Sequence, residues 1–429
     1  MPDLHSELSW RGLLHQTTDP DRLPQWLREG CRTVYCGFDP TADSLHVGSL
    51  LPLVLLRRFQ RAGHRPIALV GGATGMIGDP SGKTEERKLL SAETLEANVA
   101  GLARQMRSFL DFDAGERSAI MVNNFHWMSH FRFLDFLRDV GKNFPVNVML
   151  AKDSVRSRLE RPDGGMSYTE FSYMLLQAYD FVHLYDHYGC ELQIGGSDQW
   201  GNITAGIDLA RRMRGVQLYG ITCPLLLTSE GEKIGKSESG DKVWLSAERT
   251  SPYLFYQYWI NLPDADAGMC LRYLTELSRE EIDALDASRQ REPHLRRSQR
   301  RLADELTLLV HGPQGLAAAQ RATRVFFGEE IGQLHQSQLQ EIFQDAPCKA
   351  VPRAMLDGSG LGLLEALVAA GLATSKSESR RLVEQGGVYL NNRRCSDPHR
   401  RLTASDLVGT SFIVLRSGRK RYALLQFLA

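Results

Sequence analysis

The feature that most constrains the fold is a strand, a helix and a second strand close to the N-terminus. Residues 33–38 (TVYCGF) are rich in β-branched and aromatic side chains, and Asp39 follows them at a Pro-containing break. The apolar run of residues 50–61 stops at Gly63, as helices often do. Residues 66–72 read as a second, buried strand. This order predicts a βαβ unit of a doubly wound α/β sheet, in which ligands bind at the carboxyl ends of the strands.

The alternation of strands and helices continues and then gives way to helices. Strands are expected near 119–122 and 191–194, helices across 128–160, 168–187 and 199–213, and an extended segment over 218–228. The pattern is helical from about 250 to 325, and a small α+β unit covers 361–429. We therefore expect a Rossmann-type parallel-sheet domain over residues 1–228, a loop and helical domain over 229–327, a linker over 328–358 and a small domain over 359–429.

Composition narrows the class of protein and its partners. The 429 residues contain no run of about 20 apolar side chains, which excludes a membrane span, and the N-terminus has no signal-peptide pattern. Seven scattered cysteines without a C-x-x-C pair fit free thiols in the cytoplasm and argue against a thiolate zinc site. From Lys376 onward there are 11 Lys and Arg against 4 Asp and Glu, leaving 40 against 47 in the rest. A basic end on an acidic body indicates a polyanionic partner, although a solvated basic surface is the alternative.

Two short motifs are suited to binding a nucleotide. His46-Val47-Gly48-Ser49 opens the first predicted helix, where unpaired N–H groups attract phosphate and a glycine leaves room for an adenine ring. Alone, a helix-capping histidine explains it better. Residues 232–240 (EKIGKSESG) hold two lysines three apart between glycines, a loop able to bring two ammonium groups to a leaving pyrophosphate. Alone, an exposed turn explains this segment better.

A third motif lies on the expected helix 168–187. Tyr173, Gln177 and Asp180 stand at i, i+4 and i+7, within about 60° of one helix face. A phenol, an amide and a carboxylate among apolar neighbours suit a pocket that binds an ammonium at one end and a hydroxyl at the other. The alternative is a polar stripe facing solvent. His183 and His187 have the spacing of a zinc helix, but no acid at 184 or third ligand is evident, so we interpret them as a core or surface pair.

Together the motifs resemble the class I aminoacyl-tRNA synthetases. A His-x-Gly helix start followed about 190 residues later by Lys-x-x-Lys-Ser matches the two signatures of that family, here HVGS (46–49) and KIGKS (233–237). Four longer blocks resemble its tyrosine-specific, bacterial or organellar members. They are residues 35–46 (YCGFDPTADSLH), 71–83 (GGATGMIGDPSGK), 173–180 (YMLLQAYD) and 195–202 (GGSDQWGN). The resemblance extends over essentially the whole chain.

The resemblance implies a ligase that activates L-tyrosine with ATP, with Mg²⁺ on the triphosphate, and then charges tRNA(Tyr). It implies a tyrosine pocket formed by Tyr35, Asp79, Tyr173, Gln177, Asp180 and Gln199. It implies an ATP site formed by Gly37, Asp39, His46, Gly48, Ser49, Gly196, Asp198 and Lys236. The groups that stabilise the reacting phosphates would be Thr41, His46, Lys83, Arg87, Lys233, Lys236 and Ser237. No protein-bound metal is implied.

One departure and two rival functions accompany this resemblance. The family signature ends in a second histidine, where this chain has Ser49, which donates a hydrogen bond but carries no charge. A tryptophan-specific synthetase shares the fold, but an indole needs one acceptor and would not use both Tyr35 and Asp180. A non-catalytic RNA-binding relative is the other rival, and the intact Lys233 and Lys236 argue against it.

The basic residues predict where RNA binds. An arginine stripe that includes Arg296 and Arg300 is expected to face tRNA phosphates or solvent. The small domain at 359–429 resembles an RNA-binding domain shared with a ribosomal protein, with Lys376, Arg380 and Arg381 as candidate contacts. By analogy with the family, we expect a homodimer that uses the apolar region 131–150, and no membrane association.

Overall fold

The computed structural model describes residues 3–81, 90–152, 155–156, 159–160, 165–237, 240–332, 334–418 and 421–428. The chain forms two compact units. The first comprises residues 1–249 and 260–310, and the second comprises residues 250–259 and 311–429. The residues expected to form a separate helical domain are thus divided between two units rather than forming a third.

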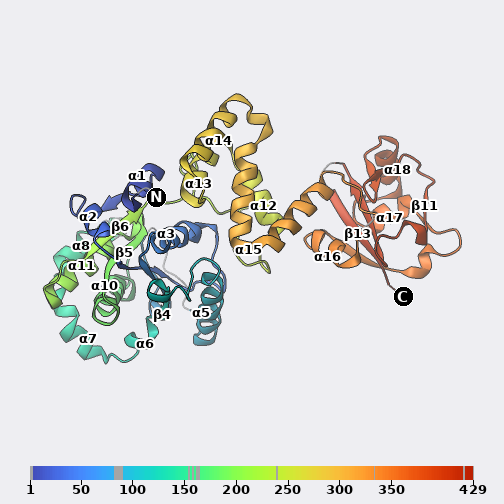
Figure 1. The fold of residues 1–429 in the computed structure, drawn as a ribbon. Helices are drawn as coiled ribbons and strands as arrows, with labels where there is room; N and C mark the ends of the chain where they lie inside the picture. Colours follow the sequence, from blue (N-terminus) through green and yellow to red (C-terminus); the bar gives the residue numbers. More distant parts are fainter. Residues whose placement is uncertain are drawn as a thin grey trace. The chain divides into compact units, whose positions relative to one another are not determined.

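The first unit is built on a six-stranded sheet with the order β1-β6-β5-β2-β3-β4 (Figure 1). Its strands are β1 (Gln16–Thr17), β2 (Thr33–Phe38), β3 (Arg65–Val70), β4 (Ile120–Asn123), β5 (Cys190–Gly196) and β6 (Tyr219–Cys223). Neighbouring strands are parallel except for β1, which is antiparallel to β6. Strands β2 to β5 lie within two residues of the predicted ranges. The α/β fold class with a doubly wound parallel sheet is confirmed.

Helices cover both faces of this sheet. They are α1 (Leu4–Arg11), α2 (Leu23–Arg28), α3 (Leu50–Arg61), α4 (Thr74–Ile77), α5 (Ala92–Met106), α6 (Phe125–Met128), α7 (Phe133–Asp139), α8 (Val146–Leu150), α10 (Tyr168–Tyr188) and α11 (Trp200–Arg214). Helices α10 and α11 pack on one face and α3 on the other (Figure 1). Tyr35 of β2 therefore lies in one hydrophobic cluster with Phe181 and Leu184 of α10.

The long helical stretch expected across 128–160 is broken into short pieces. Helices α6, α7 and α8 are separated by a 3₁₀ turn at Gly141–Asn143 and by Pro145, which precedes α8 in an extended conformation. A proline restricts its own φ and disfavours a helical residue before it, so it starts a new helix more readily than it continues one.

The chain is again helical between residues 252 and 326. The elements are α12 (Pro252–Ile260), α13 (Asp264–Leu274), α14 (Arg279–Arg291) and α15 (Arg297–Phe326). Helix α15 is interrupted at Gly312, whose φ of 70° and ψ of −178° are not helical and which Pro313 follows. Glycine adopts this conformation without a Cβ clash. The interruption lies next to the boundary between the two units. No helix of the described residues is both long and apolar enough to span a bilayer.

The second unit contains a five-stranded sheet with the order β10-β9-β12-β13-β7. Its strands are β7 (Cys348–Pro352), β9 (Val388–Leu390), β10 (Arg393–Arg394), β12 (Phe412–Ser417) and β13 (Arg421–Leu428), and β8 (Leu361–Gly362) pairs separately with β11 (Arg401–Leu402). The helices are α16 (Gln336–Ile342), α17 (Leu363–Ala369) and α18 (Lys376–Glu384). A tight turn joins β9 to β10, with left-handed φ values of 48° and 64° at Asn391 and Asn392.

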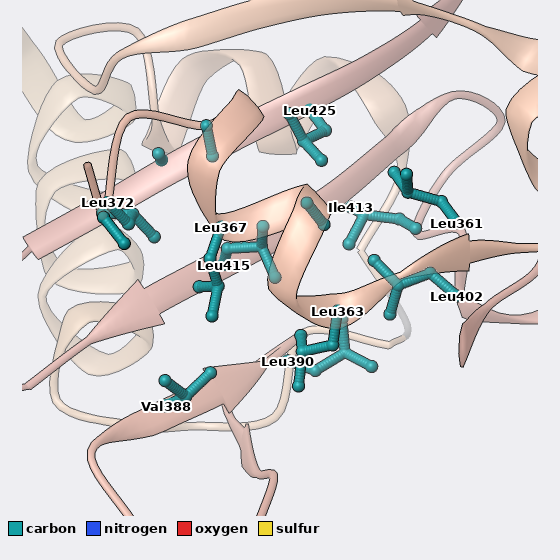
Figure 2. Packing of buried hydrophobic residues seen from close by; sticks show 14 of the residues in the cluster. Leu361, Leu363, Leu367, Leu372, Val388, Leu390, Leu402, Ile413, Leu415 and Leu425 are labelled. Carbon is teal, nitrogen blue, oxygen red and sulfur yellow. The ribbon is translucent and has the colours of Figure 1, made fainter. Parts of the chain in front are cut away.

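Alternate side chains of the central strand β12 serve two separate cores. Ile413 and Leu415 pack with α17 in the cluster that Figure 2 shows. Phe412 and Val414 pack on the other side with the end of α15 and with α16. Because neighbouring side chains of a strand point to opposite faces, a strand that is apolar throughout needs cover on both sides.

The segment expected to be a linker, 328–358, is part of this folded unit. It contains α16, whose Leu339 and Ile342 are buried, and β7, which pairs in parallel with β13. Its prolines and the run of residues 357–360 (DGSG) predict a linker between domains. The partner of β7 is more than 70 residues away along the chain, so local sequence carries little signal for the pairing.

Candidate active site

A cavity of about 310 Å³ opens at the carboxyl ends of β2 and β5, where a doubly wound sheet binds its ligands. Fifteen of the predicted site residues line it: Tyr35, Gly37, Asp39, Thr41, His46, Gly48, Ser49, Asp79, Tyr173, Gln177, Asp180, Gly196, Asp198, Gln199 and Lys233. Lys236 and Ser237 are not among the lining residues, and Lys83 and Arg87 lie outside the described residues. The cavity thus gathers side chains from segments far apart in the sequence.

The buried end of the cavity holds a phenol and a carboxylate. Tyr35 is 1% exposed, and its hydroxyl has no hydrogen-bond partner among the described residues. Burial raises the pKa of Tyr35 well above 10, and the nearby charge of Asp180 raises it further. A buried hydroxyl without a partner is costly. This end is therefore suited to a ligand that brings a polar group of its own.

Asp180 is held by two neutral donors. Its carboxylate accepts hydrogen bonds from the Trp127 indole N–H at 2.8 Å and from the Asn124 amide at 3.0 Å. Burial raises the pKa of Asp180 from 3.8 to about 7, and these two hydrogen bonds oppose that rise. The group is poised to change its charge near neutral pH.

The opposite end of the cavity is polar and interconnected. The Tyr173 hydroxyl donates to Asp39 at 3.0 Å. The Gln199 amide donates to Asp79 at 2.7 Å and accepts from Gln177 at 3.2 Å. Burial, and then the charge of Asp39, raise the pKa of Tyr173 well above 10. Two carboxylates with surrounding amide and phenol groups give this end the chemistry of an ammonium site.

A chain of hydrogen bonds joins the two ends. Asn124 donates to Asp180 and to the Thr74 hydroxyl, each at 3.0 Å. Thr74 donates to Asp39 at 2.8 Å, and Tyr173 donates to the other oxygen of the same carboxylate. We call these five residues (Asp180, Asn124, Thr74, Asp39 and Tyr173) the hydrogen-bond chain of the pocket.

Several members of the pocket were not found from the sequence. They are Thr74, Cys36 and Gln193, which line the cavity, and Asn124 and Trp127, which donate hydrogen bonds to Asp180. Asn124 immediately follows β4, so the rule that functional groups gather at strand ends identifies this position once the strand is known. No pattern in the sequence indicates that Trp127 meets Asp180, because the contact depends on how α6 packs on α10.

The HVGS motif lies where the sequence predicts, at the start of a helix. His46 caps a 3₁₀ turn (Val47–Ser49) that leads into α3, and its Nδ1 accepts the Gly48 N–H at 3.0 Å. A Cβ on Gly48 would stand 2.7 Å from the imidazole Cε1. Only glycine therefore lets this backbone pass beside the ring without displacing it.

The KIGKS loop is attached to the HVGS motif through the backbone. Val243 N–H donates to the Gly235 carbonyl, and the Val243 carbonyl accepts from Val47. Gly235 has a φ of 124°, and a Cβ there would lie 3.4 Å from the Gly48 nitrogen. This contact explains why Lys233 reaches the cavity: the loop is docked against the motif that opens α3.

The candidate RNA contacts have different surroundings. Arg296 precedes α15 in a left-handed conformation, and its guanidinium donates to the Ile260 and Leu262 carbonyls, a structural role that the sequence did not predict. Arg300 is exposed on α15. In the second unit, Arg380 and Arg381 are exposed on α18, and Lys376 forms an ion pair with Glu365.

Family models match nearly the whole chain. The model for class I tRNA synthetases (W and Y) matches residues 28–328, and that for the SYY-like C-terminal domain of tyrosine–tRNA ligase matches residues 341–425. The chain is 60% identical to a tyrosine–tRNA ligase of Rhodopirellula baltica, covering 99% of this chain and 96% of that relative. It is 53% identical to that of Roseiflexus castenholzii, covering 100% of both.

Solved structures agree on the fold. The C-terminally truncated mitochondrial tyrosyl-tRNA synthetase of Aspergillus nidulans matches with a TM-score of 0.68 and 31% identity, covering 76% of this chain and 95% of that one. The tryptophanyl-tRNA synthetase of Plasmodium falciparum matches with a TM-score of 0.53 at 14% identity, covering 79% and 87%. At that identity the second likeness concerns the fold alone.

Proposed function

From the premise that this chain belongs to the tyrosine–tRNA ligases of class I, we propose how its pocket activates tyrosine and loads it onto tRNA. In the first step the carboxylate of L-tyrosine attacks the α-phosphorus of ATP, which forms tyrosyl-adenylate and releases pyrophosphate. In the second, a terminal ribose hydroxyl of tRNA(Tyr) attacks the activated carbonyl and releases AMP. No protein side chain is the nucleophile in either step.

The observation that supports this proposal most directly is that Tyr35 and Asp180 lie near each other at the buried end of the cavity. A substrate phenol placed there accepts a hydrogen bond from Tyr35 and donates one to Asp180, which supplies the partner that the Tyr35 hydroxyl lacks. Phenylalanine leaves both groups without that partner, and an indole N–H serves the carboxylate alone. Buried polar groups left unpaired cost about 1–3 kcal/mol each, so the pocket favours tyrosine.

The polar end is assigned to the substrate ammonium. Tyr173, Gln177 and Asp79 surround it, and Gln199 stands beside the carboxylate that reacts. Because Asp79 is fixed by the Gln199 amide and by the Ser81 N–H, its carboxylate is oriented before the substrate arrives. Orientation of this kind removes part of the entropic cost of reaching the reactive geometry.

Nucleotide binding and charge stabilisation are assigned to the open side of the cavity. Adenosine would meet Gly37, Asp39, Gly48, Ser49, Gly196 and Asp198. The reacting phosphates would meet Thr41, His46, Lys83, Arg87, Lys233, Lys236 and Ser237. Catalysis then consists of positioning and of stabilising the charge that develops on the phosphates.

Mg²⁺ is proposed to enter with the triphosphate of ATP. The described residues include no cluster of three metal-binding side chains, whereas the triphosphate itself supplies oxygen ligands that Mg²⁺ prefers. The ion would neutralise the phosphate charge while the lysines of the loop approach it. Exchange activity that survives chelation of divalent ions would contradict this assignment.

The remaining assignments concern RNA, assembly and location. The exposed arginines of α18 and the basic second unit are proposed to contact the tRNA backbone, and the protein is proposed to act in the cytoplasm. A homodimer is proposed through the region around α7 and α8, where Phe133 and Leu134 are 66% and 74% exposed. Leu134→Glu should then shift the protein to monomers in sedimentation experiments, and an unchanged oligomer would count against this surface.

The decisive test is ATP–pyrophosphate exchange driven by different amino acids. Exchange with tyrosine, and at least tenfold less with phenylalanine or tryptophan, is the expected result. Tyr35→Phe and Asp180→Asn should reduce tyrosine-dependent exchange, whereas His130→Ala, at an exposed position, serves as the control. Preferred exchange with tryptophan would identify the other specificity, and no exchange with any amino acid would leave an RNA-binding protein without catalysis.

A further inference from the structure

Three aromatic rings lie in a stack that begins at a donor to Asp180. The indole of Trp127 stacks on the imidazole of His183, with ring centroids 4.2 Å apart and an angle of 14° between the planes. His183 stacks in turn on His187 at 4.0 Å and 19°. We call Trp127, His183 and His187 the ring stack. The proposed chemistry of the pocket uses neither histidine.

The two histidines of the stack lie on the same face of α10 as the Asp180 carboxylate. His183 and His187 follow Asp180 by three and seven residues on α10, which places all three on the same side of the helix. Trp127 comes from α6 and contacts α10 in two ways, through its indole N–H and through the face of its ring. Its N–H donates to Asp180 at 2.8 Å, and its ring face lies against His183.

The outer part of the stack is itself fixed. The Nδ1 of His187 is 3.0 Å from the His183 backbone carbonyl, so the exposed ring is held in place from the helix. Burial, and then the charge of His187, lower the pKa of His183 to about 4, so this ring is neutral at pH 7. A flat neutral ring covers the indole face without bringing a charge beside Asp180.

We propose that His183 is a positioning residue, which fixes the plane of Trp127 and thereby the Asp180 carboxylate that binds the substrate hydroxyl. The proposal rests on the proposed function, in which Asp180 accepts that hydroxyl. Without the flat ring, the indole turns about its side-chain bonds and its N–H leaves the carboxylate. Asp180 then keeps Asn124 as a donor, and its alignment with Tyr35 is lost.

The test separates binding of tyrosine from chemistry. His183→Ala and His183→Leu should raise the KM for tyrosine in ATP–pyrophosphate exchange by about tenfold, which corresponds to about 1.4 kcal/mol. The kcat and the KM for ATP should stay within about twofold of the unaltered protein. His183→Phe, which restores a flat ring, should return the KM for tyrosine to within about twofold. Phenylalanine should gain relative to tyrosine in the Ala and Leu variants only.

Matched controls and a spectroscopic signal complete the experiment. His130→Ala removes an exposed histidine outside the stack and should change nothing. With 5-fluorotryptophan in the six tryptophan positions, the ¹⁹F signal assigned by Trp127→Phe should move in His183→Leu and remain in place in His183→Phe.

The outcomes distinguish the two proposals. If the unaltered protein shows no tyrosine-dependent exchange, the proposed function fails and this inference fails with it. If the unaltered protein does activate tyrosine and His183→Leu keeps its KM for tyrosine, the function stands and the positioning role is overturned. A lower kcat together with equal rises in the KM for tyrosine and the KM for ATP would also overturn it, if His183→Phe does not reverse these changes.

Discussion

At the scale of single residues, Asp180 shows how an environment adjusts a functional group. Burial, and to a smaller extent the charge of Asp39, raise its pKa, and the two N–H donors that hold the carboxylate lower it, with a net value of about 7. In the proposed function, the Asp180 carboxylate accepts the substrate hydroxyl only when it is ionised. Its charge state should therefore limit tyrosine binding at pH values used in ordinary assays.

This value predicts a pH dependence for tyrosine activation. Because the pKa of Asp180 is raised, the group becomes protonated as the pH falls below about 7. The kcat/KM for tyrosine should then decline toward tenfold for each further pH unit, as expected for one ionising group of the free protein. The measurement is pyrophosphate exchange between pH 5.5 and 8.5 with subsaturating tyrosine. The decline should disappear in Asp180→Asn, and a flat profile in the unaltered protein would be inconsistent with this account.

Ser49 offers a second prediction at the same scale. It lines the cavity at the start of α3 and makes no side-chain capping bond. An imidazolium at this position would add a charged donor near the phosphates, worth about 1.5–3 kcal/mol. We expect Ser49→His to raise the rate of tyrosyl-adenylate formation by about tenfold in single-turnover experiments. Ser49→Ala is the matched control and should lower it slightly. No gain in Ser49→His would show that the missing histidine does not limit this chain.

The part of the site that lies on a single helix could be predicted from the sequence. Tyr173, Gln177 and Asp180 follow from helix geometry alone, and all three line the cavity. Asn124 and Trp127 did not follow, because their contacts with Asp180 join β4 and α6 to a helix more than 50 residues later. Such contacts depend on tertiary packing rather than on any local period.

At the scale of elements, the KIGKS loop is docked through backbone hydrogen bonds between Val47, Val243 and Gly235. Gly235 combines a φ of 124° with a position against the HVGS backbone. The loop therefore contacts the same motif that opens α3. A substitution in the loop should alter the position of the HVGS motif, and a substitution in the motif should alter the position of the loop.

Gly235→Ala should impair catalysis more than binding. A side chain at this φ costs about 1–3 kcal/mol, and its Cβ would stand in contact with Gly48, so we expect the strain to be relieved by movement of the loop from its docked position. We expect adenylate formation to slow by about tenfold or more, with the tyrosine dissociation constant unchanged in equilibrium dialysis. Gly231→Ala is the control, since its φ of 85° is also left-handed but a Cβ there has no neighbour within 4 Å. Equal kinetic effects in both variants would mean that backbone strain alone matters.

At the scale of the whole molecule, the fold class followed from the alternation of strands and helices, and the module boundaries did not. The segment 328–358 contributes α16 and β7 to the second unit. A cut at residue 360 would leave both elements without the sheet that they pack on. A cut after Gly328 removes the sheet and these elements together.

Truncation after Gly328 should separate the two steps of the reaction. Tyrosine-dependent pyrophosphate exchange should stay within about threefold of the full chain, because every described residue of the cavity precedes the cut. Charging of tRNA should fall at least a hundredfold, since the basic unit that we propose contacts RNA is gone. Truncation after residue 360 is the comparison and should aggregate or lose stability. Full charging by the shorter protein would remove the second unit from RNA recognition.

The hydrogen-bond chain has a thermodynamic consequence for the order in which ligands act. Asp39 accepts from both Thr74 and Tyr173, so one carboxylate joins the region that we propose for the nucleotide to the region that we propose for the amino acid. If one ligand changes the binding free energy of the other, the second ligand changes that of the first by the same amount, because linkage between two binding equilibria is reciprocal. If both ligands bind as proposed, a change in the affinity for ATP caused by tyrosine implies an equal change in the affinity for tyrosine caused by ATP.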